Sequence, residues 1–238
     1  MLEKIPKNAM HLSNQGWLES RFHFSFADYY DANNMNFGVL RVLNDDILHP
    51  QNGFNTHQHH DMEIISYIIE GEITHKDSMG NERTLGRGEV QYMSAGTGVF
   101  HSEYNLHDTQ NLRLLQMWII PPKQGLKPFY GEEHYTKEQR ENKLLHIVSN
   151  QNGDAKIKIH QDVDIFVCEL EANKNIQHLP QTQRQVYFIQ IEGETSINGI
   201  TLHPSDALKI TDEQHLNIVA LTNAHFLFLE MYKNKTHL

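Results

Sequence analysis

Short apolar runs separated by turn residues constrain the fold of this chain more than any other feature. Most of the runs are rich in Ile, Val, Phe and Tyr, and Gly, Asn and Asp interrupt them, whereas helical periodicity is scarce. Such runs favour strands, and regular short strands with turn signals are typical of sandwiches and barrels. The sequence therefore predicts an all-β protein. The predicted strands include 63–70, 89–93, 112–120, 164–170, 186–191 and 225–232, and the predicted hairpin turns are 78–82 and 198–199.

The segment 121–142 differs from the rest of the chain. Pro121, Pro122 and Pro128 precede a polar run at 135–142. We interpret this segment as a linker that ends in a short helix, and we place the domain boundary near it. The predicted domains are residues 1–125 and residues 126–238.

Two stretches place side chains of metal-ligand type on one face of a strand. Because successive strand side chains point to opposite faces, His57 and His59 can aim at one point, and so can His101 and Glu103. Three imidazoles and a carboxylate suit a divalent first-row metal with open coordination positions. The sequence thus predicts a site for chemistry more than for structure. By strand parity Glu63 shares the face of His57 and His59, so it is an alternative fourth ligand.

A weak internal repeat supports two related domains. The Glu-Gly-Glu turn at 70–72 recurs at 192–194, an offset of 122, and the turn at 88–89 matches 205–206 at an offset of 117. At these offsets, the positions that correspond to His57, His59, His101 and Glu103 are Leu179, Gln181, Ile218 and Ala220. None of these is a strong metal ligand, although His178 lies one position away. We therefore expect the second domain to lack the metal.

Charge and cysteine content restrict the function class. The net charge of −10 at pH 7 repels phosphate backbones and anionic membranes, which argues against direct nucleic-acid binding. Residues 1–7 lack the apolar stretch of a signal peptide, and no window approaches the ~20 apolar residues of a membrane span. The single cysteine, Cys168, excludes an internal disulfide and is interpreted as a buried, inert thiol. We expect a cytoplasmic protein.

Other candidate residues receive structural interpretations. We interpret His60 as a surface or packing residue and His75 as an exposed strand position. His23 is interpreted as a core-packing residue, with a position at the rim of a pocket as the alternative. The loop 33–38 is either an active-site lid or a plain surface loop. The glycine-rich turn at 96–98 has no strand-then-helix context, so a phosphate-binding loop is rejected.

These motifs resemble the cupin superfamily and, within it, the pirin family of two-domain cupins. The segments 16–30, 56–63, 93–98 and 101–105 are similar to bacterial pirin-like quercetinases. Ser94 stands where the second cupin motif has proline, and spacer lengths differ, which leaves the fourth ligand open between Glu63 and Glu103. Pirin-type sites place the carboxylate two residues after the last histidine, so the resemblance favours Glu103. The resemblance is close over residues 10–122 and weaker beyond. The residues that match the conserved positions of the two cupin motifs are Gly53, His57, His59, Glu63, Gly71, Gly88, Gly96, His101 and Asn105.

The resemblance implies two tandem cupin barrels, which are double-stranded β-helix or jelly-roll domains. It also implies a metal-dependent flavonol (quercetin) 2,3-dioxygenase, an oxidoreductase that opens the flavonol ring with O2 and releases carbon monoxide. His57, His59, His101 and Glu103 would hold one divalent transition metal (Fe, Mn, Ni, Cu or Zn). Glu103 would also be the general base that takes the proton of the flavonol 3-hydroxyl. The expected ligands are thus a flat aromatic substrate and O2.

Two alternatives stay open. Pirin relatives are also linked to transcription-related proteins, so the chain could be a metal-binding, redox-sensitive module that binds a protein partner. A different metal-dependent cupin reaction on a small acid is the other alternative. Two fused cupin domains could pack on each other, and we expect a monomer.

Overall fold

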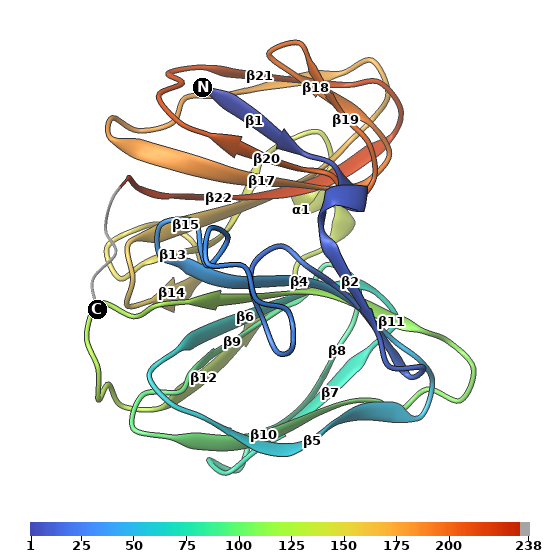
Figure 1. The fold of residues 1–238 in the computed structure, drawn as a ribbon, viewed down its shortest axis with the longest axis vertical. Helices are drawn as coiled ribbons and strands as arrows, with labels where there is room; N and C mark the ends of the chain where they lie inside the picture. Colours follow the sequence, from blue (N-terminus) through green and yellow to red (C-terminus); the bar gives the residue numbers. More distant parts are fainter. Residues whose placement is uncertain (234–238) are drawn as a thin grey trace. The chain divides into compact units, whose positions relative to one another are not determined.

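The computed structural model describes residues 1–233, and nearly all of the regular structure in this range is β-strand (Figure 1). The described residues form two compact units. One unit is His11–His134, and the other combines Met1–Met10 with the described residues from Tyr135 onward. This division differs from the predicted ranges 1–125 and 126–238 in the position of the boundary and in the assignment of the first ten residues.

The unit His11–His134 is built from two antiparallel sheets. The seven-stranded sheet contains, in spatial order, β12 (Phe129–Glu133), β9 (Val90–Ser94), β6 (Glu63–Glu70), β11 (Leu112–Ile119), β4 (Leu40–Leu48), β3 (Leu18–Phe22) and β2 (His11–Asn14). The four-stranded sheet contains β5 (Asn52–His59), β10 (Val99–Asn105), β7 (Ile73–Asp77) and β8 (Glu82–Leu85).

A shared apolar core joins the two sheets of this unit. Ile68 and Leu112 of the larger sheet and Ile73 and Leu85 of the smaller sheet belong to one buried cluster. Removing each such side chain from water stabilises the fold by roughly 1.5–3 kcal/mol. The two sheets therefore pack face to face around this apolar core.

The other unit also has a seven-stranded and a four-stranded sheet, but its larger sheet ends in one parallel pair. Its larger sheet contains β1 (Leu2–Ile5), β20 (Ala207–Ile210), β17 (Arg184–Glu192), β22 (Ala224–Tyr232), β15 (Val163–Leu170), β13 (Leu145–Asn150) and β14 (Ile157–Ile159). Its smaller sheet contains β16 (Asn175–His178), β21 (Leu216–Ala220), β18 (Thr195–Ile197) and β19 (Ile200–Leu202). The short helices of this unit are the 3-10 helix η1 (Lys7–Ala9) and α1 (Lys137–Arg140).

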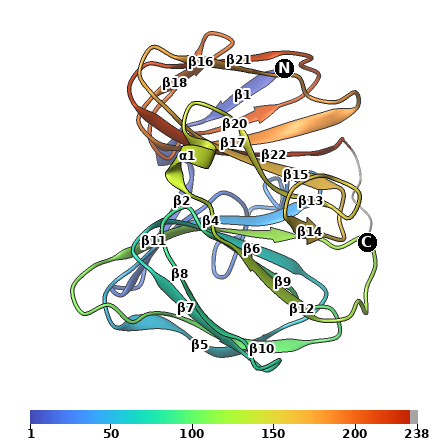
Figure 2. The ribbon, with the colours of Figure 1, turned by 180° about the vertical axis from the view of Figure 1, so that it is seen from behind.

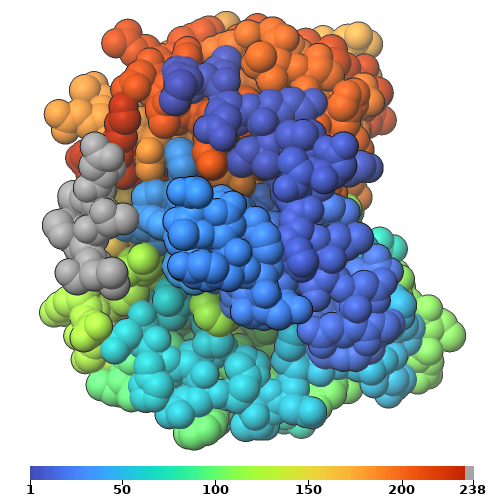
Figure 3. Space-filling model, in the orientation of Figure 1, coloured from blue at the N-terminus to red at the C-terminus, as the bar shows by residue number. Residues whose placement is uncertain are grey.

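The matching strand order makes each unit a cupin-type barrel, which confirms the predicted all-β fold with two tandem cupin domains. The edge strand β1 pairs with β20 as β12 pairs with β9. Figure 3 shows the first residues of the chain, in dark blue, against the orange segments of their unit. This pairing explains why Met1–Met10 belongs with the second half of the chain.

The linker prediction is correct in one part and wrong in another. The short helix exists as α1, and a capping box between Thr136 and Gln139 begins it. The stretch Phe129–Glu133, which we expected in the linker, is instead β12, because it pairs with Val90–Ser94 at the edge of the sheet (Figure 2). The local sequence of a strand predicts it poorly when the strand forms only by pairing with a distant segment of the chain.

Most of the strand predictions are confirmed. The run 63–70 matches β6, and the turns at 78–82 and 198–199 join β7 to β8 and β18 to β19. Cys168 is buried in β15 as expected, and burial raises the pKa of its thiol to about 12. None of the helices within residues 1–233 has the length and apolarity to cross a membrane.

Candidate metal centre

Strand pairing brings the predicted histidines together. His57 on β5 lies opposite His101 on β10, and their Nε2 atoms are 3.0 Å apart. The ring of His59 lies 4.8 Å from each of theirs, measured between centroids. The Nδ1–H of His57 donates to the carbonyl oxygen of Asn55 at 2.7 Å, which leaves its Nε2 as the lone-pair nitrogen. Ligand atoms of the three histidines all lie within 4.8 Å of one another.

The donor set fits a divalent transition metal. Two nitrogen ligands at about 2.1 Å from one ion and about a right angle apart would be separated by about 3.0 Å, which is the separation of the two Nε2 atoms. Imidazole nitrogens with a carboxylate nearby suit first-row transition metals better than Ca²⁺ or Mg²⁺, which prefer oxygen ligands. The geometry of this chain therefore agrees with the predicted kind of ion.

Two of the imidazoles, those of His59 and His101, are held in the neutral form. Burial, together with the like charges of His101 and His57, lowers the pKa of His59 to about 3, although the charge of Glu103 opposes the shift. Burial likewise lowers the pKa of His101 to about 3, assisted by His57 and His75. A neutral imidazole keeps a lone pair on one ring nitrogen, so these two rings need no net loss of a proton when an ion binds.

Glu103 is a buried carboxylate held by two amides. Its side chain is 1% exposed, and a ligand oxygen of Glu103 lies within 4.8 Å of ligand atoms of His101 and His75. The amide of Gln91 donates to Oε1, and the amide of Gln116 donates to Oε2 at 2.8 Å. The four predicted residues thus belong to two overlapping groups of donor atoms that share His101.

A cavity of about 380 Å³ opens onto the candidate ligands. Its lining includes His57, His59 and Glu103. This volume lies in the range of about 300–1,000 Å³ that is usual for small-molecule sites. Five aromatic side chains also line the cavity, and these are Trp17, Phe22, Phe26, Phe54 and Trp118.

The same cavity has a polar side. Ser20, Asn44 and Asp46 line it, and the hydroxyl of Ser20 donates to Asp46. Burial raises the pKa of Asp46 to about 7; the Ser20 hydrogen bond opposes this rise, and the charges of Asp45 and Glu103 add to it. The Oδ1 atom of Asn44 is buried and has no hydrogen-bond partner among residues 1–233. The cavity therefore combines aromatic walls with buried polar groups that can recognise hydroxyl groups.

Glu63, the alternative fourth ligand, lies in neither group of donor atoms. It begins β6 and is fully buried, where its carboxylate accepts a hydrogen bond from the Tyr92 hydroxyl at 2.7 Å. Its partners on the neighbouring strands are Ser94 and Ile119. The alternation of side chains along β5 does not predict the direction of Glu63, because residues 60–62 separate β5 from β6 and the two strands belong to different sheets.

The interpretation of His75 as an exposed residue is wrong. Its side chain is completely buried, and its ring stacks on Tyr130 of β12 at 4.6 Å. Its ring centroid lies 5.3 Å from that of His101. The alternation of His75 and Asp77 on one face of β7 was the available signal, but the polar neighbours of His75 suggested solvent exposure. Gln91, Gln116 and Trp118 were also missed, and nothing local distinguishes them from other strand residues.

The remaining histidine interpretations hold. His60 is exposed, and His23 is buried in the core, where desolvation lowers its pKa to about 4. The loop 33–38 does not contribute to the cavity lining, to which Phe26 and Ala27 contribute instead.

Strand registers align the two units residue by residue. Ser66 lies opposite both Gln91 and Gln116, as Phe188 lies opposite Leu208 and Phe228. Glu103 lies opposite His75, as Ile218 lies opposite Ile197, so Leu216 corresponds to His101. The polar set His75, Gln91, His101, Glu103 and Gln116 is therefore replaced by Ile197, Leu208, Leu216, Ile218 and Phe228, which all belong to one buried apolar cluster.

This register corrects the sequence alignment of the halves. Ile218 corresponds to Glu103 rather than to His101, and His178 rather than Leu179 corresponds to His57, because His178 lies opposite Leu216. Within residues 1–233, both groups of three or more metal-type side chains lie in the unit His11–His134.

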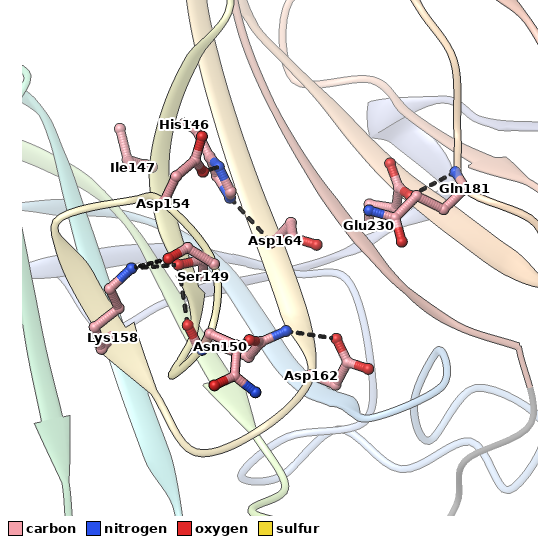
Figure 4. A network of polar contacts seen from close by, with 12 residues as sticks. His146, Ile147, Ser149, Asn150, Asp154, Lys158, Asp162, Asp164, Gln181 and Glu230 are labelled. Atoms are coloured by element: carbon pink, nitrogen blue, oxygen red, sulfur yellow. Dashed lines mark hydrogen bonds and ion pairs between the residues drawn. The ribbon is translucent and has the colours of Figure 1, made fainter.

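Two histidines of the second unit contact carboxylates. His178 Nε2 lies 2.6 Å from Glu230 Oε2. His146 lies between Asp154, at 2.5 Å from Nδ1, and Asp164, at 3.0 Å from Nε2 (Figure 4). Burial opposes the charged form of His146, but the two carboxylates outweigh it and raise the pKa of the imidazole above its ordinary value.

Comparison with protein families matches both halves of the chain. A family model described as Pirin matches residues 6–119, and a model described as the quercetinase C-terminal cupin domain matches residues 146–231. The chain is 41% identical to the quercetin 2,3-dioxygenase of Escherichia coli K12 over 92% of this chain and 94% of the relative. It is 38% identical to a pirin-like protein of Caulobacter vibrioides over 97% of this chain and 99% of the relative.

Solved structures give the same result. The crystal structure of YhhW from Escherichia coli matches with a TM-score of 0.93 at 38% identity, covering 100% of both chains. A structure of this bacterial pirin in complex with nickel(II) matches with a TM-score of 0.92 at 38% identity, covering 98% of this chain and 99% of the other.

Proposed function

The chain belongs to the pirin family, and from this premise we propose that it is a metal-dependent flavonol 2,3-dioxygenase. In this proposal it opens the ring of quercetin or a related flavonol with O2 and releases carbon monoxide. The relatives named quercetin 2,3-dioxygenase support the reaction class, and the nickel complex of YhhW supports a divalent metal whose identity in this chain is open among Fe, Mn, Ni, Cu and Zn.

One observation carries the proposal: the cavity with aromatic walls has candidate metal ligands in its lining. A flat aromatic substrate fits between such walls because stacking and edge contacts with aromatic rings favour it. His57 and His59 line the same cavity, so a substrate oxygen can approach the ion that they would hold. A purely structural metal site would be closed to ligands.

His57, His59, His101 and Glu103 would hold the ion, which when bound supplies Lewis acidity toward a substrate oxygen. Glu103 lines the cavity, and its carboxylate takes the proton of a flavonol hydroxyl as general base. Gln116 donates to that carboxylate and in turn accepts a hydrogen bond from Trp118 Nε1 at 3.0 Å.

Trp118 connects the wall of the cavity to the ligands. Its ring lies edge-on to His59 at 4.8 Å and to Phe26 at 5.3 Å. These contacts fix the direction of the His59 imidazole and cover it from solvent on one side. A dry site strengthens the electrostatic interactions of Glu103 with a developing charge.

The test is oxygen-dependent consumption of quercetin, followed by its visible absorbance, with protein loaded in turn with iron(II), manganese, nickel or copper. Metal-free protein and His101→Ala should be inactive, whereas His203→Ala, which changes an exposed histidine of the other unit, should match the parent. No consumption with any metal, from protein shown to hold about one equivalent, would overturn the proposal.

The alternative of a redox-sensitive module that binds a protein partner predicts a different outcome. Metal-dependent capture of a protein partner, without consumption of a flavonol, would support that alternative. The comparisons do not favour it, because the relatives carry the names of dioxygenases or of pirin-like proteins. Turnover of a small acid without O2 would instead indicate another cupin reaction.

A further inference from the structure

His75 is a buried histidine directly behind the candidate ligand His101. It lies opposite Glu103 in the pairing of β7 with β10, and Asp77 lies opposite His101. The ring centroids of His75 and His101 are 5.3 Å apart, and the ring of Tyr130 stacks on that of His75 at 4.6 Å. A completely buried imidazole is costly unless its polar atoms are used, so its position calls for a function.

Asp77 determines which nitrogen of His75 carries the hydrogen. Its Oδ2 lies 3.2 Å from His75 Nε2, and its Oδ1 accepts the backbone N–H groups of Met79 at 2.8 Å and Asn81 at 3.0 Å. The carboxylate is therefore fixed by the β7–β8 turn and can only accept. His75 Nε2 consequently carries the hydrogen, and its Nδ1 has a lone pair.

The hydrogen of His101 is assigned in the same way. The Nδ1–H of His57 is used by the Asn55 carbonyl, so in the metal-free protein we assign the hydrogen of His101 to Nε2, from which it can be donated to His57 Nε2 at 3.0 Å. His101 Nδ1 then has a lone pair, as has His75 Nδ1. Two lone pairs cannot form a hydrogen bond, which agrees with the finding that both Nδ1 atoms are buried and without a partner among residues 1–233.

We propose that His75 and Asp77 are positioning residues that hold His101 in the form that binds the metal. When Nε2 of His101 binds a cation, the hydrogen on Nε2 leaves to solvent and Nδ1 takes one up, so the ring stays neutral. His75 Nδ1 accepts the new Nδ1–H, and the chain Asp77–His75–His101 is complete. Carboxylates and carbonyls commonly orient metal-binding imidazoles in this way. The inference rests on the proposed metal site but not on the turnover of a flavonol.

The second unit provides an internal comparison. Ile197 occupies the position of His75, and Leu216 occupies the position of His101. The buried histidine is therefore replaced together with the ligand that it would support, and both positions join an apolar core. A role of His75 in packing alone would not require it in one unit and isoleucine in the other.

Zinc(II) affinity, measured by competition with a chelator, tests the inference without catalysis. His75→Phe keeps an aromatic ring against Tyr130 but removes the acceptor, and we expect zinc affinity to fall about 10- to 100-fold. His75→Asn places a carbonyl oxygen at the Nδ1 position and should recover most of the loss. His203→Phe, a change to an exposed histidine in the other unit, is the matched control and should bind as the parent does.

Nitrogen-15 NMR of the parent protein tests the same inference without any variant. Zinc should move the hydrogen of His101 from Nε2 to Nδ1, and an Nδ1-to-Nδ1 coupling or a shifted His75 Nδ1 resonance should appear. An unchanged zinc affinity in folded His75→Phe, an equal loss in His75→Asn, or a His101 hydrogen that stays on Nε2 would each overturn the inference. Zinc binding as expected, with no flavonol consumed, would refute the proposed function alone.

Discussion

Gln116 and Glu103 are joined by a hydrogen bond of 2.8 Å between two side chains that the barrel buries. In the second unit the corresponding pair is Phe228 and Ile218, which belong to an apolar core. One cupin barrel thus keeps a buried carboxylate with amide donors, while the other fills the same positions with hydrocarbon. The difference separates a barrel suited to chemistry from a barrel suited to stability.

Loss of the amide donor should destabilise the first barrel. In Gln116→Leu, one oxygen of Glu103 stays buried without its donor, which costs about 1–3 kcal/mol. We expect a corresponding decrease in the free energy of unfolding by urea. Gln110→Leu changes an exposed side chain and should leave stability within about 0.5 kcal/mol. Equal stability of both variants would show that the hydrogen bond has no net effect.

Glu103→Gln separates metal binding from catalysis. The three histidines remain, so we expect most of the metal content to be retained, while turnover falls about 100-fold or more because the general base is lost. Metal content by elemental analysis and initial rates with quercetin measure the two effects. Unaltered turnover would refute the general-base role of Glu103. Complete loss of metal would show instead that Glu103 acts mainly as a metal ligand.

Gly53→Ala should disturb the metal site through the backbone. A Cβ at Gly53 would lie 2.3 Å from the carbonyl oxygen of Glu103 and 2.6 Å from the Cα of Tyr104, so β5 must move away from β10. This movement changes the spacing of His57 and His101, which the two strands set. We expect weaker zinc binding and a lower unfolding midpoint.

The control for this prediction is Gly86→Ala. There the nearest atoms to a Cβ lie 3.9 Å away, and the backbone does not adopt a positive φ. This variant should bind zinc as the parent does. A Gly53→Ala protein with parental zinc affinity would show that the strand spacing tolerates the added methyl group.

Stability should decrease as the pH falls from about 6.5 to about 4, in part because of His23. Burial lowers its pKa from 6.5 to about 4; the charge of Asp45 opposes the shift and that of Arg21 adds to it. In this window the unfolded chain binds a proton that the folded protein cannot, whereas above pH 6.5 neither state binds it. The full effect amounts to about 3 kcal/mol.

His23→Gln is the measurement for this prediction. The metal-free variant should lose less stability than the parent between pH 6.5 and 4, although it can be less stable at every pH. His59 and His101 also have lowered pKa values, but they contribute equally in both proteins. Parallel pH profiles of the two proteins would contradict the assignment to His23.

The sequence was sufficient for those features that depend on local spacing. The alternation of His57 with His59 and of His101 with Glu103 predicted residues that the strands do bring together. The run 63–70 matches β6 because a buried strand is rich in β-branched residues throughout.

Features set by long-range pairing could not be predicted. His75 has polar neighbours in the sequence, and its burial depends on Tyr130, which lies on a strand 55 residues away that we expected to be linker. In the same way, β1 belongs to the second unit through its pairing with β20. Register across a sheet, rather than residue type, decides such positions.

The most direct test of the central claim is the amount of carbon monoxide released per quercetin consumed, under oxygen, by protein with about one equivalent of a bound divalent metal. We predict one carbon monoxide per quercetin, and none from metal-free protein or from His101→Ala. Quercetin loss without carbon monoxide, or equal release in the controls, would contradict a dioxygenase built on His57, His59, His101 and Glu103.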